Sequence, residues 1–387
     1  MVTPTSRKRH STSPAERHGP GRRQGGALAC GRGICAVCAL LVGLGSTACN
    51  ERQAEPVGQS SPSAAASPSP VPAAAQPPAL RDLPAGDRAI AASRADGLVR
   101  TGQTRVELVS AGEPPRRLLR YRLALPERGR LVVTAQIAMT VHHPGEPPVT
   151  LPVPPLRVVL DLDVIPAEGD AATVSLTIGE VAVNPADEAE QTVAAEMAPV
   201  LAGLRSMAST FQLPPRGIDV GPLQPSRRPT PEVLQLWTTV GEAVRDLVIP
   251  YPVAEVGSGA QWKVFDRVRR AGIGMVRRTT YRVVALDDQF ITLAAESREV
   301  AIASAGRRDP ALPADQIIEV VRGDSTGSRA VVRPVDRLLP RDSESKLLGK
   351  ITMDTRPPPE LVPDGAARRS SVQLYQTLRV TPVPLVW

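Results

Sequence analysis

Apolar and polar residues alternate along most of the chain beyond residue 105, which is the pattern of β-strands with one buried face. The segment 156–164 shows this well, because Leu156, Val158, Leu160 and Leu162 stand among charged neighbours. We expect strands over residues 117–125, 130–141, 157–165, 173–183, 261–269, 275–286, 290–302, 316–322, 328–335, 347–354 and 372–381. Short polar segments at 127–129, 167–170, 270–274 and 287–289 predict turns of antiparallel hairpins.

Two segments have helical periodicity instead. In residues 187–211 the apolar positions recur about every 3.6 residues, and Pro199 and Gly203 predict a kink. The second helix is expected to begin with Thr230 as N-cap and Pro231 in the first turn, and to end before Pro250. Its apolar stripe consists of Val233, Leu236, Trp237, Val240, Val244, Leu247 and Val248.

These elements predict a mainly β fold with two helices (α+β), built as a large curved antiparallel sheet or half-barrel packed on amphipathic helices. Residues 83–387 are expected to form a single β-rich domain. A faint repeat relates 159–183 to 283–300, since both read as strand, acidic turn, strand. Two related halves, 105–225 and 226–387, are therefore also a prediction.

The N-terminal region has the features of a bacterial lipoprotein leader. All four cysteines fall within the first 49 residues, and a basic segment precedes the apolar run 34–44, which is too short to span a bilayer. We predict a signal peptide over 1–48, a lipidated Cys49, and a disordered Pro/Ala/Ser linker to residue 82. Ser46 departs from the usual lipoprotein box, so ordinary cleavage nearby is the alternative. Asn50 after the cysteine favours the outer membrane over the inner one in a Gram-negative cell.

The charge of the chain comes mainly from this leader. The chain has 46 basic and 39 acidic side chains, and residues 1–49 hold seven and one of these, so the remainder is near +1. Only ten aromatic residues occur in the chain. Without a basic face or stacking aromatics, we expect no nucleic-acid partner.

Candidate catalytic and metal-binding patterns are weak. His142 and His143 are adjacent at a strand end and point to opposite faces, so we expect no metal site and no cofactor. The segment 323–327 (Gly-Asp-Ser-Thr-Gly) matches a nucleophile-elbow pattern, but no helix or histidine follows it, and we interpret it as a hairpin turn. A hydrolase would require Ser325 or His143 in a cleft beside a carboxylate. The arginine pairs at 227–228, 269–270 and 277–278 are interpreted as solvated.

Three short segments, 119–121, 256–262 and 280–283, resemble an uncharacterised family of bacterial secreted lipoproteins, known as a domain of unknown function. The resemblance covers about residues 105–382. The order of strands and helices also resembles the lipoprotein-carrier clamshell, whose concave face holds helices and sometimes acyl chains. We further expect Trp262 to be a core anchor.

We therefore predict a noncatalytic cell-envelope protein, exported to the periplasm and held to the membrane by its lipid anchor. It would bind a lipid or another apolar ligand in a concavity lined by Val193, Met197, Leu201, Leu204, Val233, Trp237, Val240 and Val244. The alternative is a surface scaffold whose core is fully packed by these same residues. A hollow between sheet and helices favours the first, and an exposed apolar patch over a packed core favours the second.

Overall fold

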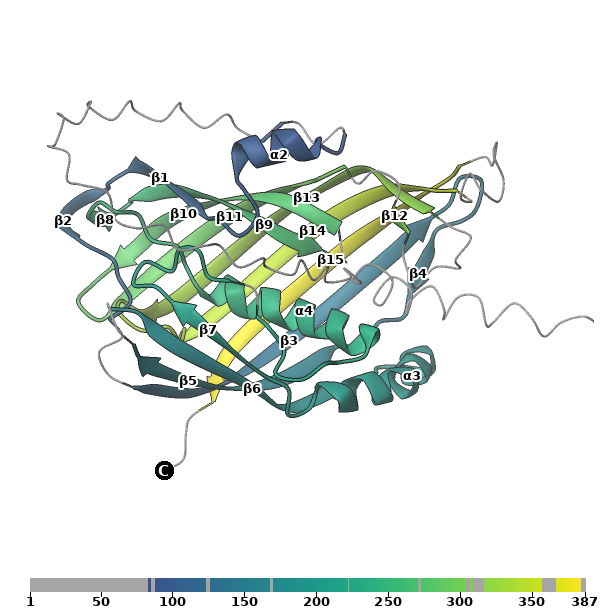
Figure 1. Ribbon diagram of the computed structural model, residues 1–387, viewed down its shortest axis with the longest axis horizontal. Helices are drawn as coiled ribbons and strands as arrows, with labels where there is room; N and C mark the ends of the chain where they lie inside the picture. The colour runs from purple at the N-terminus through teal and green to yellow at the C-terminus, as the bar shows by residue number, and fades with distance from the viewer. Residues whose placement is uncertain are drawn as a thin grey trace, which may run out of the picture.

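The computed structural model describes residues 83–84, 88–122, 126–167, 170–221, 223–270, 273–303, 307–308, 317–356 and 367–383. The expected signal peptide, Cys49 and the linker lie outside the described residues. The described chain is mainly β and contains three helices, as Figure 1 shows. These are α2 (Ala92–Leu98), which was not predicted, α3 (Glu188–Leu204) and α4 (Pro231–Leu247).

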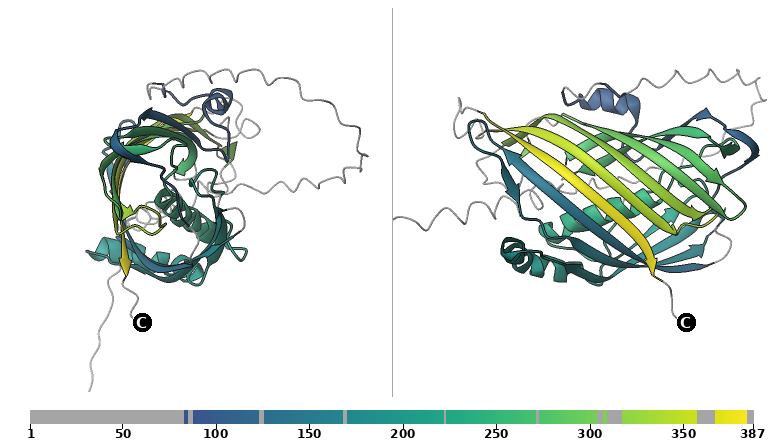
Figure 2. Two further views of the ribbon diagram at one scale, coloured as in Figure 1. Left: turned by 90° about the vertical axis from the view of Figure 1, so that its left-hand side faces the viewer. Right: turned by 180° about the vertical axis from the view of Figure 1, so that it is seen from behind.

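One large antiparallel sheet of 13 strands dominates the fold. Its main path runs β1-β9-β10-β11-β13-β14-β15-β3-β5-β6-β7, with β12 on β13 and β4 on β3, while β2 and β8 form a separate pair. The strands are β1 (Arg105–Ser110), β2 (Glu113–Arg117), β3 (Glu127–His142), β4 (Val149–Leu151), β5 (Leu156–Pro166), β6 (Ala172–Val183), β7 (Ala208–Leu213), β8 (Val256–Ser258), β9 (Gln261–Arg270), β10 (Ile273–Leu286), β11 (Phe290–Ala301), β12 (Arg307–Arg308), β13 (Ile317–Pro334), β14 (Asp342–Arg356) and β15 (Arg368–Val383). The sheet curves strongly but does not close, and β1 and β7 are its two edges (Figure 2).

Three predicted hairpins are confirmed, namely β5–β6, β9–β10 and β10–β11. Strands from both parts of the chain belong to one sheet. Strand β1 pairs with β9, and β15 pairs with β3 along 13 residue pairs from Ser371↔His142 to Val383↔Arg130.

The described residues 118–122 contain no strand, although one was expected there, and the turn expected at 127–129 is wrong. Strand β2 ends at Arg117, and Glu127 is already the first residue of β3. Prolines at 114 and 115 hid β2 from the sequence pattern, because proline is unfavourable in regular strands.

The hairpin turn expected at 323–327 is also wrong, because these residues lie in the middle of the 18-residue strand β13. The glycines there serve close packing rather than a turn. A Cβ at Gly323 would lie 2.7 Å from the Cβ of Ala301, and one at Gly327 would lie 2.5 Å from the Oγ of Ser297. Only glycine allows the neighbouring strands to approach so closely.

The first helix is shorter than predicted. Asp187 caps α3 by accepting from the backbone N–H of Glu190, but the helix ends at Leu204 instead of continuing to Phe211. Ser206 has a φ of +61°, which turns the chain, and residues 208–213 then alternate as edge strand β7. The second helix begins as predicted, since Thr230 accepts from the N–H of Val233 and Pro231 is the first helical residue.

Buried apolar side chains form three clusters. The largest contains residues of α3 and α4, such as Leu204 and Trp237, together with strand residues such as Leu131 and Leu160. A second cluster lies around Met275 and Met353 on the strands. A third lies beneath α2 and includes Ala95 and Phe265. Figure 2 shows α4 on the concave side of the curved sheet and α2 on its outer side.

Candidate functional site

A row of polar side chains crosses four adjacent strands on the face of the sheet toward α4. The ladder places Asp266 (β9) opposite Arg277 (β10), Arg277 opposite Glu299 (β11), and Glu299 opposite Ser325 (β13). Each of these residues stands at a position where the alternation along its strand predicts a buried side chain. Hydrophobic residues continue the same face on both sides of the row. The row therefore separates the largest apolar cluster from the second one.

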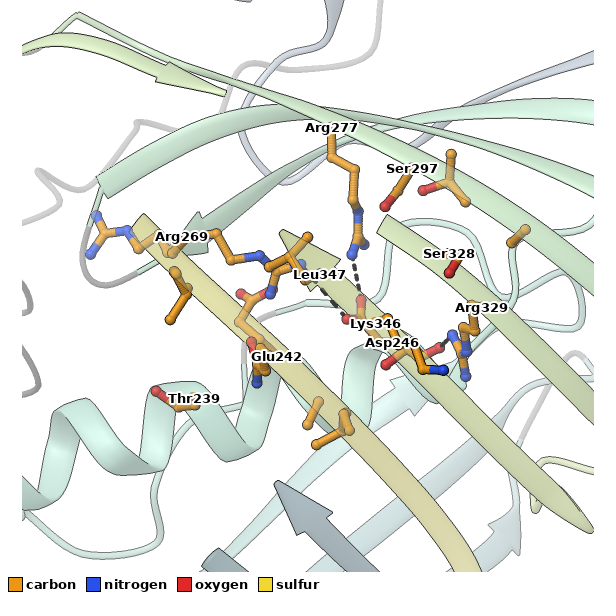
Figure 3. A pocket seen from close by; sticks show the side chains of 18 of the residues that line it. Thr239, Glu242, Asp246, Arg269, Arg277, Ser297, Ser328, Arg329, Lys346 and Leu347 are labelled. Carbon is orange, nitrogen blue, oxygen red and sulfur yellow. Dashed lines mark hydrogen bonds and ion pairs between the residues drawn. The ribbon is translucent and has the colours of Figure 1, made fainter. Parts of the chain in front are cut away.

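Ion pairs join this row to α4. Arg277 donates to Asp266 through two nitrogens, at 2.9 and 2.6 Å, and to Asp246 in the last turn of α4 at 2.6 Å. Arg270 forms a bidentate pair with the fully buried Glu299, at 2.7 and 3.1 Å. These charge-assisted bonds are short and mostly buried, which compensates the charges for lost hydration. The network fixes the C-terminal end of α4 to the sheet, as the dashed lines in Figure 3 show for Asp246.

Strand β13 adds two further arginines to the same helix end. Arg329 donates to the carbonyl of Asp246, and Arg333 donates to the carbonyl of Leu247 at 3.2 Å. Carbonyls in the last turn of a helix lack partners within the helix, and cations there also favour the helix dipole. Arg333 is fully buried and lies over the ring of Tyr121, 4.7 Å from its centroid. Both arginines therefore donate hydrogen bonds to carbonyl groups at the C-terminal end of α4.

Burial and charge act in opposite directions on the titratable groups here. Burial alone would raise the pKa of Asp246, but Arg277, Arg270 and Arg329 outweigh it and lower that pKa to about 2. The pKa of Glu299 is lowered as well, because Arg270 outweighs the effect of burial. Glu242, one helical turn before Asp246, behaves differently. Burial raises its pKa despite the nearby Arg245, and its Oε2 has no hydrogen-bond partner in the described part of the chain.

Two cavities adjoin this network. The first, of about 160 Å³, is lined by Glu242, Asp246, Arg277, Arg329 and neighbouring residues of β3, β9 to β11 and β13 to β15 (Figure 3). The second, of about 100 Å³, is almost wholly apolar and lies between helices α3 and α4 and strands β3, β5 and β15. Five residues line both cavities: Ile137, Thr239, Ala243, Gln376 and Leu378. The charged and the apolar space are therefore neighbours along α4.

The predicted lining residues divide between this apolar cavity and the core. Val193, Met197 and Val240 line the cavity. The others, Leu201, Leu204, Val233, Trp237 and Val244, are buried in the largest apolar cluster. Trp237 is fixed there by its indole N–H, which donates to the carbonyl of Leu223 at 3.0 Å. The sequence did not indicate the strand residues that form the opposite wall, such as Val133, Val158 and Leu378.

Arg270 and Arg277 correct the interpretation of the arginine pairs as solvated. Their side chains are only 16% and 15% exposed, and both belong to the buried network. Adjacent strand residues point to opposite faces, so one member of each pair must face inward when the strand has a buried side. The phase of the alternation was the available signal, because Met275, Thr279 and Tyr281 are the buried neighbours of Arg277 on β10.

The other candidate patterns are not brought into a catalytic arrangement. Ser325 is buried and donates to Glu299 at 2.7 Å, and that carboxylate is already held by Arg270. His142 lies at the end of β3, as predicted, and both it and His143 are half-buried. Among the described residues, no group of three His, Cys, Asp or Glu side chains could hold a metal ion.

The three segments that carry the family resemblance meet in the core. Tyr121, Trp262 and Tyr281, with Tyr251, form a chain of aromatic rings whose neighbouring centroids lie 5.2 to 6.4 Å apart. Trp262 is fully buried, as predicted, and its indole N–H donates to the carbonyl of Pro250 at 2.9 Å. These residues connect the end of α4 to β9 and β10, so their role in the fold is structural.

Comparisons with known proteins add no identity. No family model matches the chain, and no curated protein matches it. Among solved structures, a crystal structure of Pseudomonas aeruginosa OccK2 (OpdF) is similar at 9% sequence identity and a TM-score of 0.14, over 69% of this chain and 100% of that one. A similarity at that TM-score supports no statement about fold or function. The expected membership in a lipoprotein family stays a prediction.

Among the described residues, no helix combines the length and the apolar composition that crossing a bilayer requires.

Proposed function

We propose that this chain is a noncatalytic, lipid-anchored protein of the cell envelope that binds an apolar or amphipathic ligand between its helices and its sheet. In this proposal the curved sheet acts as a half-barrel packed on α3 and α4. The observation that carries it is the apolar cavity of about 100 Å³ between these helices and strands β3, β5 and β15. Protein interiors contain few voids larger than a water molecule, so an apolar cavity of this size favours a ligand over simple core packing.

The size of the cavity limits what can enter it as it stands. An engineered cavity of about 150 Å³ in another protein holds one benzene ring. A long acyl chain would therefore require α3 and α4 to move apart. The polar bonds between α4 and the sheet described above are concentrated in its last turn, at Asp246 and Leu247. The preceding turns over the cavity are thus the part of α4 most suited to such a movement.

The scaffold alternative would use the outer face of the sheet. Leu348 and Tyr375 are opposite each other on β14 and β15, and their exposed fractions are 48% and 45%. Two neighbouring exposed apolar residues form a small patch, and single exposed apolar residues are common on monomeric proteins. We therefore place this reading second.

Native mass spectrometry of the full chain, expressed with its leader in a Gram-negative host, tests the ligand-binding proposal. We expect a co-purifying lipid or other apolar molecule. The variant Ala243→Leu fills the cavity from α4 with a good helix former, so the ligand should be lost while the protein stays folded. Ala195→Leu on the exposed side of α3 is the matched control and should keep the ligand. A ligand-free mass for the unaltered chain, with no uptake of added lipid, would overturn the proposal and favour the scaffold.

The anchoring part of the proposal rests on Cys49 and the segment before it, which precede the described residues. Several acyl chains would hold the protein to the membrane permanently, whereas a single chain binds reversibly. We expect Cys49→Ser to shift the protein from the membrane to the soluble fraction, as measured by fractionation and by the mass of the N-terminal peptide. An unchanged distribution with an unmodified Cys49 would contradict lipidation.

A further inference from the structure

Arg329 differs from Arg270 and Arg277, which lie near the same end of α4. Arg270 and Arg277 each bind carboxylates within 3 Å, whereas the hydrogen bonds of Arg329 go to the Oγ of Ser343 and the carbonyl of Asp246. In the described part of the chain, no carboxylate forms a salt bridge with Arg329. Burial lowers the pKa of its guanidinium, although Tyr281 and Asp246 act in the other direction. A guanidinium carries five N–H donors, so this half-buried cation has donors left over on the cavity wall.

Glu242 is the second group on this wall with an unmet hydrogen-bonding atom. Its side chain is 13% exposed, its Oε1 accepts from Arg245, and its Oε2 has no partner in the described part of the chain. Arg329 and Glu242 thus present unused hydrogen-bonding atoms to the same cavity, from the sheet and from α4.

Carboxylates bind several of the other basic residues in the lining of this cavity. Glu299 and Asp266 lie behind the lining and neutralise Arg270 and Arg277. Lys346 is paired in the same way with Glu344, at 3.1 Å. Arg329 has no such carboxylate partner within the described residues, and an anionic group of a ligand would take that place.

We propose that the cavity beside Arg329 and Glu242 binds the single anionic group, a carboxylate or a phosphate, of an amphipathic ligand whose apolar part lies in the adjoining cavity. This inference rests on the proposed function and specifies its ligand class. The two cavities share residues of α4, β3 and β15, so one molecule of modest length can reach both. Guanidinium groups bind both anions by paired hydrogen bonds, which is why the two remain alternatives for the same site.

Binding of three eight-carbon probes to the full chain, measured by calorimetry, tests this assignment. The probes are octanoate, octyl phosphate and the neutral octanol. We expect both anions to bind at least about tenfold more tightly than octanol, because a hydrogen bond to a charged group is stronger than a neutral one. Tighter binding of octanoate indicates a fatty acid as the natural class, and tighter binding of octyl phosphate indicates a phosphate-bearing lipid.

The variant Arg329→Gln should lose this preference and still bind octanol, which uses only the apolar cavity. Arg282→Gln on the exposed side of β10 is the matched control and should keep it. The proposal is overturned if octanol binds as tightly as the anions, if Arg329→Gln keeps the preference, or if that variant loses octanol as well, since the arginine would then be structural. Failure of all three probes on the unaltered chain would instead overturn the ligand-binding function itself.

Discussion

The interior between the sheet and α4 has an apolar region and a charged region, and the same helix borders both. In the apolar region Leu236, Val240 and Ala243 face β3, β5 and β15 around a cavity. In the charged region Asp246 is bound by arginines from β10 and β13. Apolar packing is non-directional and tolerates rearrangement, whereas a buried ion network needs every partner in place. The comparison indicates a helix that is fixed at its C-terminal end and adaptable over its preceding turns.

Breaking the charged region should have the largest effect. Arg277→Met leaves Asp246 and Asp266 buried without their main cation, and we expect a loss of roughly 3–5 kcal/mol in the free energy of unfolding. Urea denaturation measures this. Arg128→Met at the surface pair with Asp163, where the arginine is 74% exposed, should cost less than about 1 kcal/mol. Equal losses of unfolding free energy in the two variants would mean that the buried network contributes no more to stability than a surface ion pair.

Truncating the apolar region tests the other side of the comparison. Leu204 of α3 is fully buried in the largest cluster, so Leu204→Ala should cost roughly 2–5 kcal/mol through lost burial and a new void. Leu118→Ala, at a side chain that is 39% exposed, should change stability by less than about 0.5 kcal/mol. If α4, which packs on this end of α3 through Val233, adapts as we infer, the loss at Leu204 falls at the lower end of its range. A loss at the upper end would contradict an adaptable apolar region.

The third effect is a pH dependence that only the charged region should show. The folded-state pKa of Asp246 is about 2, below the ordinary value of 3.8, so its carboxylate stabilises the fold above about pH 4 and loses this effect as the pH falls toward 2. The stability gap between the unaltered chain and Asp246→Asn should therefore shrink by about 2 kcal/mol over that interval. The control is Asp163→Asn at the surface pair. A gap for Asp246→Asn that does not change with pH would show that this carboxylate is not held by arginines.

The hairpins could be predicted because each of their strands shows the alternation of apolar and polar residues within its own sequence. Alternation along β5, β6, β9, β10 and β11 is local information, and acidic or glycine-rich turns mark where it reverses. Strand β7 was missed because Met207 and Phe211 fit both a helical stripe and an alternating strand, and only the backbone turn at Ser206 separates the two. The glycines of β13 resembled a turn in the sequence. They are needed because a side chain at these positions would collide with Ala301 and Ser297, which lie on the neighbouring strand and cannot be identified from the local sequence.

The candidate site was predictable only in its apolar part. Helical periodicity identified Val193, Met197 and Val240, which do line the cavity, whereas the opposite wall depends on which strands lie beneath α4. The charged part was missed because charged residues were assigned to solvent by type. Arg277 and Glu299 stand in the buried phase of their strands, and the ion pair of Arg277 with Asp246 of α4 requires the tertiary fold.

The pairing of β15 with β3 has a consequence for how the chain folds. Gln136 of β3 pairs with Thr377 of β15. One side of β3 therefore stays unpaired until β15, the last described strand, has been synthesised. Contacts between residues so far apart in the sequence slow folding, since a long loop must close before they form. During that interval the long open edge of β3 can pair with other chains. A protein of this topology is therefore expected to depend on chaperones while its C-terminal strands are still being delivered.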